Sequence, residues 1–426
     1  MKRLRFLHAA DLHLDSPFKG MSALPERIRE RVRESTFDTL GELVRLAIRE
    51  RVDFVLIAGD VYDVADRSLR AQIRFQQAVE QLSSEGIPTY LIHGNHDPQD
   101  GRAAQLDWPA DVHFFACDRV ETVQVIKEDR GIIAEVHGIS YGTAAVTDNL
   151  AQRFAKGSEP VYQIGLLHTN VDGDANHDNY APCTKQDLLR AGMDYWALGH
   201  VHTRQIIQAQ GPVIVYPGNL QGRSIREQGP RGAYVVDVHE DGRADLSFQA
   251  LDAVRWYEET LDTTAITTEQ GLKDALGDLL DRVRGTADGR AAIVRVVLAG
   301  RSALHRLLRQ GQGRALQELV DELREEEAEQ SRFVWIESVV DRTASELDLA
   351  ALAGENSFLG DLLRYADGLQ QDEAALQAFA DEALAALQGL PQSVRGSVNA
   401  EQLREWLRAA QQLAADLLTE EGGRRE

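Results

Sequence analysis

Residue types that bind divalent metal ions recur at five places in the first half of the chain. They occur in the patterns D-x-H, GD-x-x-D, GNHD, a histidine that ends LLH, and GH-x-H, whose members are Asp11, His13, Asp60, Asp63, Asn95, His96, Asp97, His168, His200 and His202. Carboxylate, imidazole and amide oxygen together suit Mn, Fe or Zn better than the all-oxygen ligand sets of calcium. These residues therefore favour a binuclear metal site.

Each of these motifs comes directly after a short apolar run. The runs fall within residues 4–11, 53–60, 88–97, 162–170 and 194–202, and amphipathic helices are expected over 25–50 and 67–85. Ligands of open α/β sheets bind in the crevice outside the carboxyl ends of the strands, so the five strand ends should converge. Each motif by itself is also common in turns that bind no metal. Their joint occurrence after apolar strands is what indicates a site.

The remainder of the chain predicts two further regions. Alternating segments with Gly-rich turns around 111–139 and 205–249 indicate antiparallel hairpins, so the first domain should be a mixed α/β structure. Strand and helix patterns then alternate in a small α+β unit, and the final segment is rich in Ala, Leu, Glu and Gln and should be helical. We expect three domains, at 1–254, 255–342 and 343–426.

Composition limits how the protein could hold a polyanion. The 426 residues carry a formal net charge of −22, of which −14 falls after residue 250, so no global positive field attracts nucleic acid and any such ligand must be bound locally. Eleven of the 12 histidines precede residue 250, which places the chemistry in the first domain. Cys117 and Cys183 cannot form a disulfide framework, and no apolar run is long enough to cross a bilayer. These features predict a soluble, cytoplasmic protein.

The motif series over residues 4–250 resembles that of the calcineurin-like metallophosphoesterases. Within that superfamily, the segments HAADLHLDSPF, YAPC, DYWALGHVH and YPGNLQGRSIRE are similar to the bacterial YhaO group of DNA repair exonucleases, which is related to SbcD. The resemblance implies a sandwich of two mixed β-sheets flanked by helices, followed by a small α+β capping, DNA-binding domain and a helical C-terminal region. It also implies two divalent metal ions, Mn²⁺ by preference with Fe or Zn as alternatives.

The resemblance also assigns roles to the motif residues. It places one metal ion on Asp11, His13 and His202, the other on Asn95, His168 and His200, and Asp60 between them. A hydroxide bridging the two ions would attack the phosphodiester. His96 would act as general acid toward the leaving 3′ oxygen, with Asp97 orienting it. Asp63 stands where some relatives carry His, and receives only a supporting role.

Three functions are open at this point. The first is a Mn²⁺-dependent phosphodiesterase acting on DNA in repair, a 3′–5′ exonuclease with single-strand endonuclease activity as well. The second is a phosphatase or small-molecule phosphodiesterase, which the acidic charge would fit more easily. The third, of a different class, is a non-catalytic scaffold subunit of an SMC-like ATPase complex.

The expected partners are DNA, a second copy of the chain and an ATPase. Arg223 and Arg226 follow the last metal motif and could bind the DNA backbone, although ordinary solvent-facing arginines would look the same. By resemblance, the protein should form a homodimer, and the helices of 343–426 should dock an SMC-like ATPase of the Rad50 type, similar to YhaN or SbcC. Those helices could equally pack onto their own chain. The role of His177, in the loop DGDANHDNYAPC, stays undecided.

Overall fold

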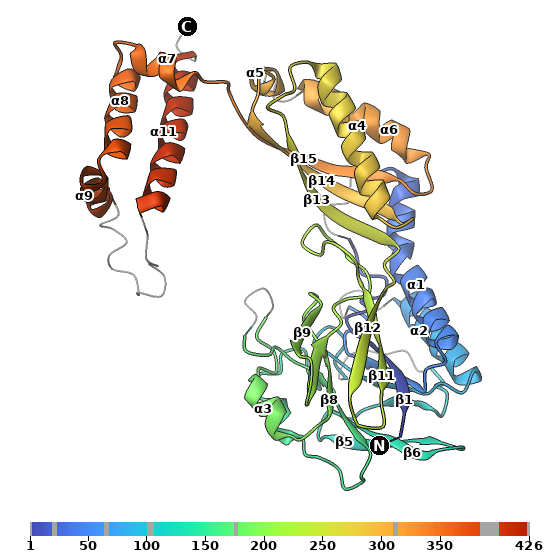
Figure 1. Ribbon diagram of the computed structural model, residues 1–426. Helices are drawn as coiled ribbons and strands as arrows, with labels where there is room; N and C mark the ends of the chain where they lie inside the picture. Colours follow the sequence, from blue (N-terminus) through green and yellow to red (C-terminus); the bar gives the residue numbers. More distant parts are fainter. Residues whose placement is uncertain are drawn as a thin grey trace. The chain divides into compact units, whose positions relative to one another are not determined.

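The computed structural model describes residues 2–18, 24–63, 68–99, 106–173, 178–309, 314–383 and 400–423 (Figure 1). His177 lies outside these residues. No helix in the described part of the chain is long and apolar enough to span a membrane. The chain forms two compact units: the first consists of Met1–Glu259, Leu280–Arg295 and Leu323–Ser338, and the second of Thr260–Leu279, Val296–Glu322 and Val339–Glu426.

The first unit contains two six-stranded sheets. The first sheet consists, in spatial order, of β12 (Ala244–Ala250), β11 (Gly232–Val238), β1 (Leu4–Ala9), β2 (Phe54–Ala58), β3 (Thr89–Ile92) and β4 (Val112–Phe114). Strands β1 to β4 are parallel, whereas β11 runs antiparallel to β1 and to β12. The prediction of a mixed sheet is therefore confirmed.

The second sheet is also mixed. It consists, in spatial order, of β5 (Glu121–Lys127), β6 (Gly131–Gly138), β7 (Tyr162–His168), β8 (Tyr195–Gly199), β10 (Val213–Tyr216) and β9 (Gln205–Gln208). The central strands β6, β7, β8 and β10 are parallel, and both edge strands are antiparallel to their neighbours. Two short helices, η2 (Leu150–Arg153) and α3 (Lys185–Arg190), belong to its connections.

The two sheets pack face to face. Phe6 and Leu56 of the first sheet share one buried cluster with Ile164 and Tyr195 of the second. The His8 ring in β1 also lies across this interface, with Nδ1 3.0 Å from the Tyr195 hydroxyl. Strands β2, β7 and β8 are buried along their whole length, which explains why their sequences are mostly apolar and do not alternate between apolar and polar residues. The predicted sandwich is confirmed.

Two long helices cover the outer face of the first sheet. They are α1 (Glu26–Arg49) and α2 (Leu69–Ser84), close to the predicted helical ranges, and they lie side by side in Figure 1. Leu43 and Val44 of α1 and Phe75 of α2 pack against strand residues such as Val55 in one buried cluster. Helix α2 begins after Ser68, whose hydroxyl accepts a hydrogen bond from the backbone N–H of Ala71.

A third sheet follows in the chain. It consists of β13 (Val254–Asp262), β14 (Ala291–Arg301) and β15 (Val334–Ala344), and its connections contain α4 (Glu269–Thr286), α5 (His305–Arg309) and α6 (Arg314–Ala328). Within the first unit, Trp256, Ile293 and Trp335 of this sheet form a buried cluster with Ile28 and Val32 of α1. The first strand of the third sheet is thereby fixed to the helix that covers the first sheet.

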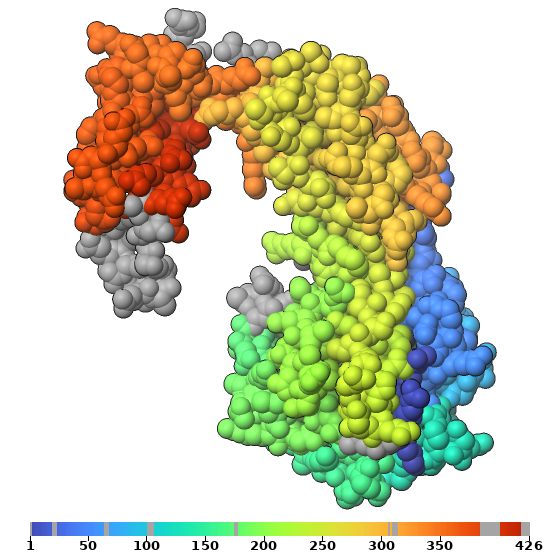
Figure 2. Space-filling view, in the orientation of Figure 1, coloured from blue at the N-terminus to red at the C-terminus, as the bar shows by residue number. Residues whose placement is uncertain are grey.

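The last described helices pack on one another in the second unit. They are α7 (Leu349–Gly354), α8 (Phe358–Gln371), α9 (Glu373–Ala383) and α11 (Ala400–Gly423), drawn in orange and red in Figure 2. The buried Gln411 of α11 donates hydrogen bonds to Asp367 Oδ1 (2.8 Å) and to the Leu363 carbonyl (3.3 Å) of α8. The predicted helical C-terminal region is confirmed.

Candidate metal centre

The chemistry-bearing residues lie at the carboxyl ends of β1, β2, β3, β7 and β8. The chain beyond β1 runs beside the chain beyond β2, because the Asp11 N–H donates to the Gly59 carbonyl (3.1 Å) and the His13 N–H to the Asp60 carbonyl (3.0 Å). The Asp11 carboxylate also accepts the His200 N–H at 3.0 Å, which connects the end of β1 in the first sheet to the end of β8 in the second. Backbone hydrogen bonds thus bring the strand ends to one place.

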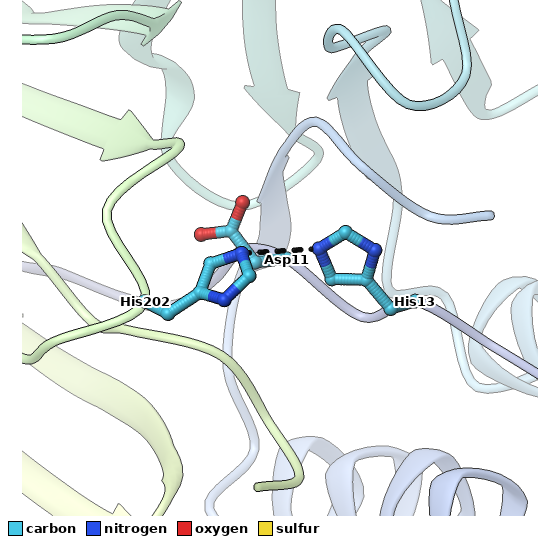
Figure 3. Close-up of side chains that lie close together, drawn as sticks. All are labelled: Asp11, His13 and His202. Atoms are coloured by element: carbon cyan, nitrogen blue, oxygen red, sulfur yellow. Dashed lines mark hydrogen bonds between the residues drawn. The ribbon is translucent and has the colours of Figure 1, made fainter. Parts of the chain in front are cut away.

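The first expected ligand set is assembled. Asp11, His13 and His202 each direct one ligand atom into a common space, with these atoms within 4.8 Å of one another (Figure 3). The two imidazole Nε2 atoms are 3.2 Å apart, the contact drawn as a dashed line in Figure 3. One carboxylate oxygen and two imidazole nitrogens at this separation fit a transition metal of the Mn, Fe or Zn type.

The second expected set lies beside the first. The side-chain oxygen of Asn95 is 2.9 Å from His168 Nε2 and 3.1 Å from His200 Nδ1. The Asp60 Oδ2 atom is 3.4 Å from His168 Nε2 and 3.7 Å from His13 Nε2, so it faces both sets. Asp60 therefore occupies the position that a bridging ligand requires.

Close packing at the site requires glycine. A Cβ atom on Gly94 would lie 2.2 Å from Asp60 Oδ1 and 2.8 Å from His168 Cε1. Gly59, which precedes Asp60, has a φ of +90°, and a Cβ there would lie 2.6 Å from His168 Nδ1. Gly59 of GD-x-x-D and Gly94 of GNHD therefore leave room for the side chains of Asp60 and His168.

Several expected ligands have a strained backbone. Asp11, His13 and Asp60 have φ values of 53°, 43° and 54°, and His200 has a φ of 100°. Residues with a Cβ rarely adopt this region, and each instance costs on the order of 1–3 kcal/mol. Such strain concentrates where a structure holds side chains in a functional arrangement.

The electrostatics of the site match a bound cation. Asp11 and Asp60 are buried carboxylates that lie close enough to repel one another, and their other charged neighbours are histidines. Burial raises the pKa of Asp11, while for Asp60 the effect of burial is outweighed by His168 and His13, which lower its pKa. Burial would lower the pKa of His168, but the charge of Asp60 prevails and raises it to about 9. A divalent cation bound among these side chains would offset their buried negative charge, so the residues present fit the expected metals.

The second ring nitrogen of each of the four expected ligand histidines contacts a fixed oxygen atom on the side away from the candidate metal positions. The partner atoms are Asp63 Oδ1 for His13 (2.8 Å), the Ala58 carbonyl for His168 (2.8 Å), the Asp178 carbonyl for His200 (2.7 Å) and Glu227 Oε1 for His202 (2.7 Å). Such outer partners fix the tautomer and the orientation of a ligating histidine. The sequence did not single out Glu227, although it stands in the segment GRSIREQG that follows the last metal motif.

The carboxylate beside His96 is Asp63, not Asp97. The half-exposed His96 ring places Nδ1 2.8 Å from Asp63 Oδ1. The buried Asp97 instead accepts hydrogen bonds from the backbone N–H groups of Gly94 (2.7 Å), Val61 (2.9 Å) and Asp60 (3.2 Å). Asp97 therefore ties the GNHD loop to the end of β2, while Asp63 contacts the ring that Asp97 was expected to orient.

The two arginines proposed for substrate contact lie in different surroundings. The Arg223 side chain is only 17% exposed, with its guanidinium 3.4 Å from Asp63 and 3.8 Å from Glu227. Arg226 is exposed. The charge of Arg223 is thus already shared with two carboxylates, while Arg226 faces solvent.

Comparison with known proteins identifies the family. Residues 4–204 match the model of the calcineurin-like phosphoesterases, and residues 256–344 match the middle domain of metallophosphoesterase YhaO. The uncharacterized metallophosphoesterase YhaO of Bacillus subtilis is 41% identical over 364 residues, which cover 85% of this chain and 87% of that protein. The chain belongs to the YhaO family of calcineurin-like metallophosphoesterases. The family predicted from the motifs is confirmed.

More distant relatives of this YhaO-family chain include a protein named for DNA repair and a protein named as a nuclease subunit. The DNA double-strand break repair protein Mre11 of Sulfurisphaera tokodaii is 25% identical over 313 residues, covering 71% of this chain and 75% of that protein. The SbcD component of the nuclease SbcCD from Bacillus subtilis is 25% identical over 268 residues, covering 55% of this chain and 66% of that protein. Membership of the YhaO family implies a metal-dependent phosphoesterase.

Proposed function

We propose that this protein is a Mn²⁺-dependent phosphodiesterase that acts on DNA, as a 3′–5′ exonuclease with single-strand endonuclease activity. The observation that carries the proposal is the meeting of two ligand sets at Asp60, with the half-exposed His96 beside them. The His96 N–H donates to Asp60 Oδ1 at 2.9 Å, so the loop that carries the ring is attached directly to the bridging carboxylate. The relatives named as a DNA double-strand break repair protein and as a nuclease subunit support DNA as the substrate.

Seven residues would hold the metals: Asp11, His13 and His202 one ion, Asn95, His168 and His200 the other, and Asp60 both. When bound, two divalent ions supply Lewis acidity toward the phosphodiester and the attacking water. Mn²⁺ is the ion we expect, with Fe or Zn as alternatives suited to the same donor atoms. The neutral amide of Asn95 leaves more positive charge for the phosphate than a carboxylate would.

His96 is proposed to supply the proton for the leaving 3′ oxygen. Its Nδ1 is held by Asp63, which leaves Nε2 directed away from that carboxylate. Burial would lower the pKa of His96, but the hydrogen bond to Asp63 and the charge of Asp60 outweigh it and raise the pKa. A raised pKa favours the protonated ring, which is the form that a general acid requires. Asp63 positions this ring, and Asp97 supports the loop that carries it.

One assay separates the three functions. Purified protein with Mn²⁺ is incubated with end-labelled DNA and with a chromogenic phosphodiester, beside the variant His96→Ala. We expect stepwise shortening from the 3′ end, and a loss of turnover in His96→Ala of roughly 10²–10⁴-fold while Mn²⁺ remains bound. Hydrolysis of the chromogenic ester without cleavage of DNA would favour the small-substrate alternative. Absence of both activities in Mn²⁺-loaded protein would favour the scaffold.

We also propose that the C-terminal helices bind an SMC-like ATPase of the Rad50 type, such as a YhaN- or SbcC-like protein. Trp406, Leu413 and Leu417 of α11 are 49%, 60% and 56% exposed, and their spacing places them on one face of the helix. Exposed apolar side chains aligned along a helix favour a helical partner. The relative SbcD, named as part of the nuclease SbcCD, supports a two-protein complex.

The docking proposal has its own test. The double change Leu413→Asp with Leu417→Asp should abolish co-elution with the ATPase and leave Mn²⁺-dependent hydrolysis intact. Gln412→Asp, at an exposed neighbouring position, is the matched control and should still co-elute. Unchanged co-elution of the double variant would contradict the proposal.

The expected homodimer has a candidate surface on α2. Leu69 and Ile73, one helical turn apart, are both exposed there. We propose that this face pairs with a second copy of the chain. Sedimentation of Ile73→Glu should then show a monomer where the parent protein shows a dimer, and a dimer in both would move the interface elsewhere.

A further inference from the structure

The four ligand histidines differ in what holds them. His168 and His200 are held by backbone carbonyls, of Ala58 and Asp178. His13 and His202, which belong to the same expected metal position, are both held by carboxylates. A carboxylate partner makes an imidazole a stronger electron donor than a carbonyl partner does, because it stabilises positive charge on the ring. The two metal positions are therefore built differently.

Glu227 is fixed tightly enough to orient His202. Its side chain is 14% exposed, with Oε1 2.7 Å from His202 Nδ1. The other oxygen, Oε2, accepts the backbone N–H of Arg223 at 2.6 Å. Both carboxylate oxygens are thus engaged, and the one facing His202 has a defined direction.

Arg223 lies between the two outer carboxylates. One terminal nitrogen is 3.4 Å from Asp63 Oδ2 and the other is 3.8 Å from Glu227 Oε1. Its positive charge offsets the cost of placing two anions close together at a site that already contains Asp11 and Asp60. Asp63, Arg223 and Glu227 thereby connect His13 to His202 on the side of the rings away from the metal position.

The loop that carries Glu227 is anchored at both of its flanks. On one flank, the Arg231 guanidinium donates to the His202 carbonyl and to Asn219 Oδ1 (3.0 Å). On the other, the Trp256 indole N–H donates to the Gly222 carbonyl at 2.8 Å, while on the Arg231 side the Gly229 N–H donates to the Trp256 carbonyl at 3.1 Å. The position of Glu227 therefore depends on the first strand of the third sheet as well as on the metal centre.

We infer that Glu227 is a positioning residue that sets the affinity of the one metal ion held by Asp11, His13 and His202, and leaves the other ion unaffected. This inference rests on the proposed binuclear site. Glu227 acts by holding the Nδ1 hydrogen of His202, so that the Nε2 lone pair points at the ion. Losing such a partner lowers metal affinity by about 10–100-fold.

The test is a Mn²⁺ titration of metal-free protein, with free Mn²⁺ followed by electron paramagnetic resonance. The wild-type chain should bind about two ions. In Glu227→Gln, one ion should keep its wild-type affinity and the other should bind about 10–100-fold more weakly. Glu227→Ala should weaken that same ion further, because alanine offers no acceptor to the Nδ1 hydrogen. The control is Glu337→Gln, which removes a partly buried carboxylate paired with Arg295 away from any ligand, and should bind as wild type.

The outcomes separate this inference from the proposed function. Two ions bound by Glu227→Gln with wild-type affinity would overturn the inference and leave the binuclear phosphodiesterase standing. Equal weakening of both ions would also overturn it, because Glu227 would not then act through His202 alone. Wild-type protein that binds no Mn²⁺ would overturn the proposed function and this inference together.

Discussion

Replacing Gly94 by alanine should damage both metal positions through a single methyl group. The added Cβ would lie 2.2 Å from Asp60 Oδ1 and 2.8 Å from His168 Cε1, whereas carbon and its non-bonded neighbours prefer about 3.5 Å, so Asp60 must move by about 1 Å. A displacement of that size in a catalytic group costs roughly 100-fold in rate. Because Asp60 faces both ligand sets, both Mn²⁺ ions should bind more weakly, in contrast to the single ion affected by Glu227→Gln.

The same substitution should lower stability. Overpacking a buried site costs about 1–3 kcal/mol, which for a domain of this size corresponds to about 2–12 °C in the unfolding midpoint. Thermal unfolding and Mn²⁺ titration of Gly94→Ala would measure both effects. Gly277→Ala is the matched control, because Gly277 lies within α4 with open space around it and alanine there should stabilise the helix by about 0.5–1 kcal/mol. Two Mn²⁺ ions bound by Gly94→Ala with parental affinity would refute the packing argument.

Three further predictions concern other residues. Burial lowers the pKa of His8 to about 3, whereas in the unfolded chain it is near 6.5, so between these pH values only the unfolded chain takes up the proton. The free energy of unfolding should therefore fall as the pH falls, by about 2 kcal/mol at pH 5. Denaturant titrations of His8→Phe should show a weaker pH dependence, and an unchanged pH dependence would contradict this prediction. Arg226→Ala should reduce the salt dependence of DNA binding by about one phosphate contact, measured by fluorescence anisotropy, and an equal slope would remove this residue from the interface. The Tyr216 hydroxyl donates to a backbone carbonyl at 2.7 Å, whereas the buried Tyr141 hydroxyl has no hydrogen-bond partner within the described residues. Tyr216→Phe should therefore lose about 1 kcal/mol of stability and Tyr141→Phe should not, and equal losses would contradict the difference.

The grouping of the candidate metal-site residues could be predicted largely from sequence because these residues follow strands. Asp60 and His168 each come at the end of a fully buried apolar run, and the shared direction of parallel strands brings such ends together. Periodicity also predicted α1 and α2, whose apolar positions repeat at helical spacing. The residues expected to hold the cations lie in local motifs after strands, which is why they can be predicted from the sequence.

The outer contacts could not be predicted in this way. Glu227 contacts His202 although the two residues are 25 positions apart in the sequence, and nothing in the local pattern distinguishes Glu227 from a solvent-facing glutamate. Asp97 follows His96 directly, which favoured it as the partner of that ring, yet its carboxylate turns to backbone N–H groups and Asp63 takes the place beside His96. Side-chain direction at a tight loop depends on the folded backbone, which sequence spacing alone does not determine.

The backbone is left-handed at Asp11, His13, Asp60 and His200. This strain should make the metal-free form of the candidate site less favourable than a metal-bound form. Without cations, the fold carries both this strain and the mutual repulsion of buried carboxylates, which the backbone N–H groups that donate to Asp11 and Asp60 offset in part. Glycine at any of these four positions would relax the backbone, but it would also remove an expected ligand and, at Asp11 and Asp60, a carboxylate that accepts a backbone N–H. Cations bound as proposed would offset this strain and repulsion, and would thereby help to keep this region of the chain folded.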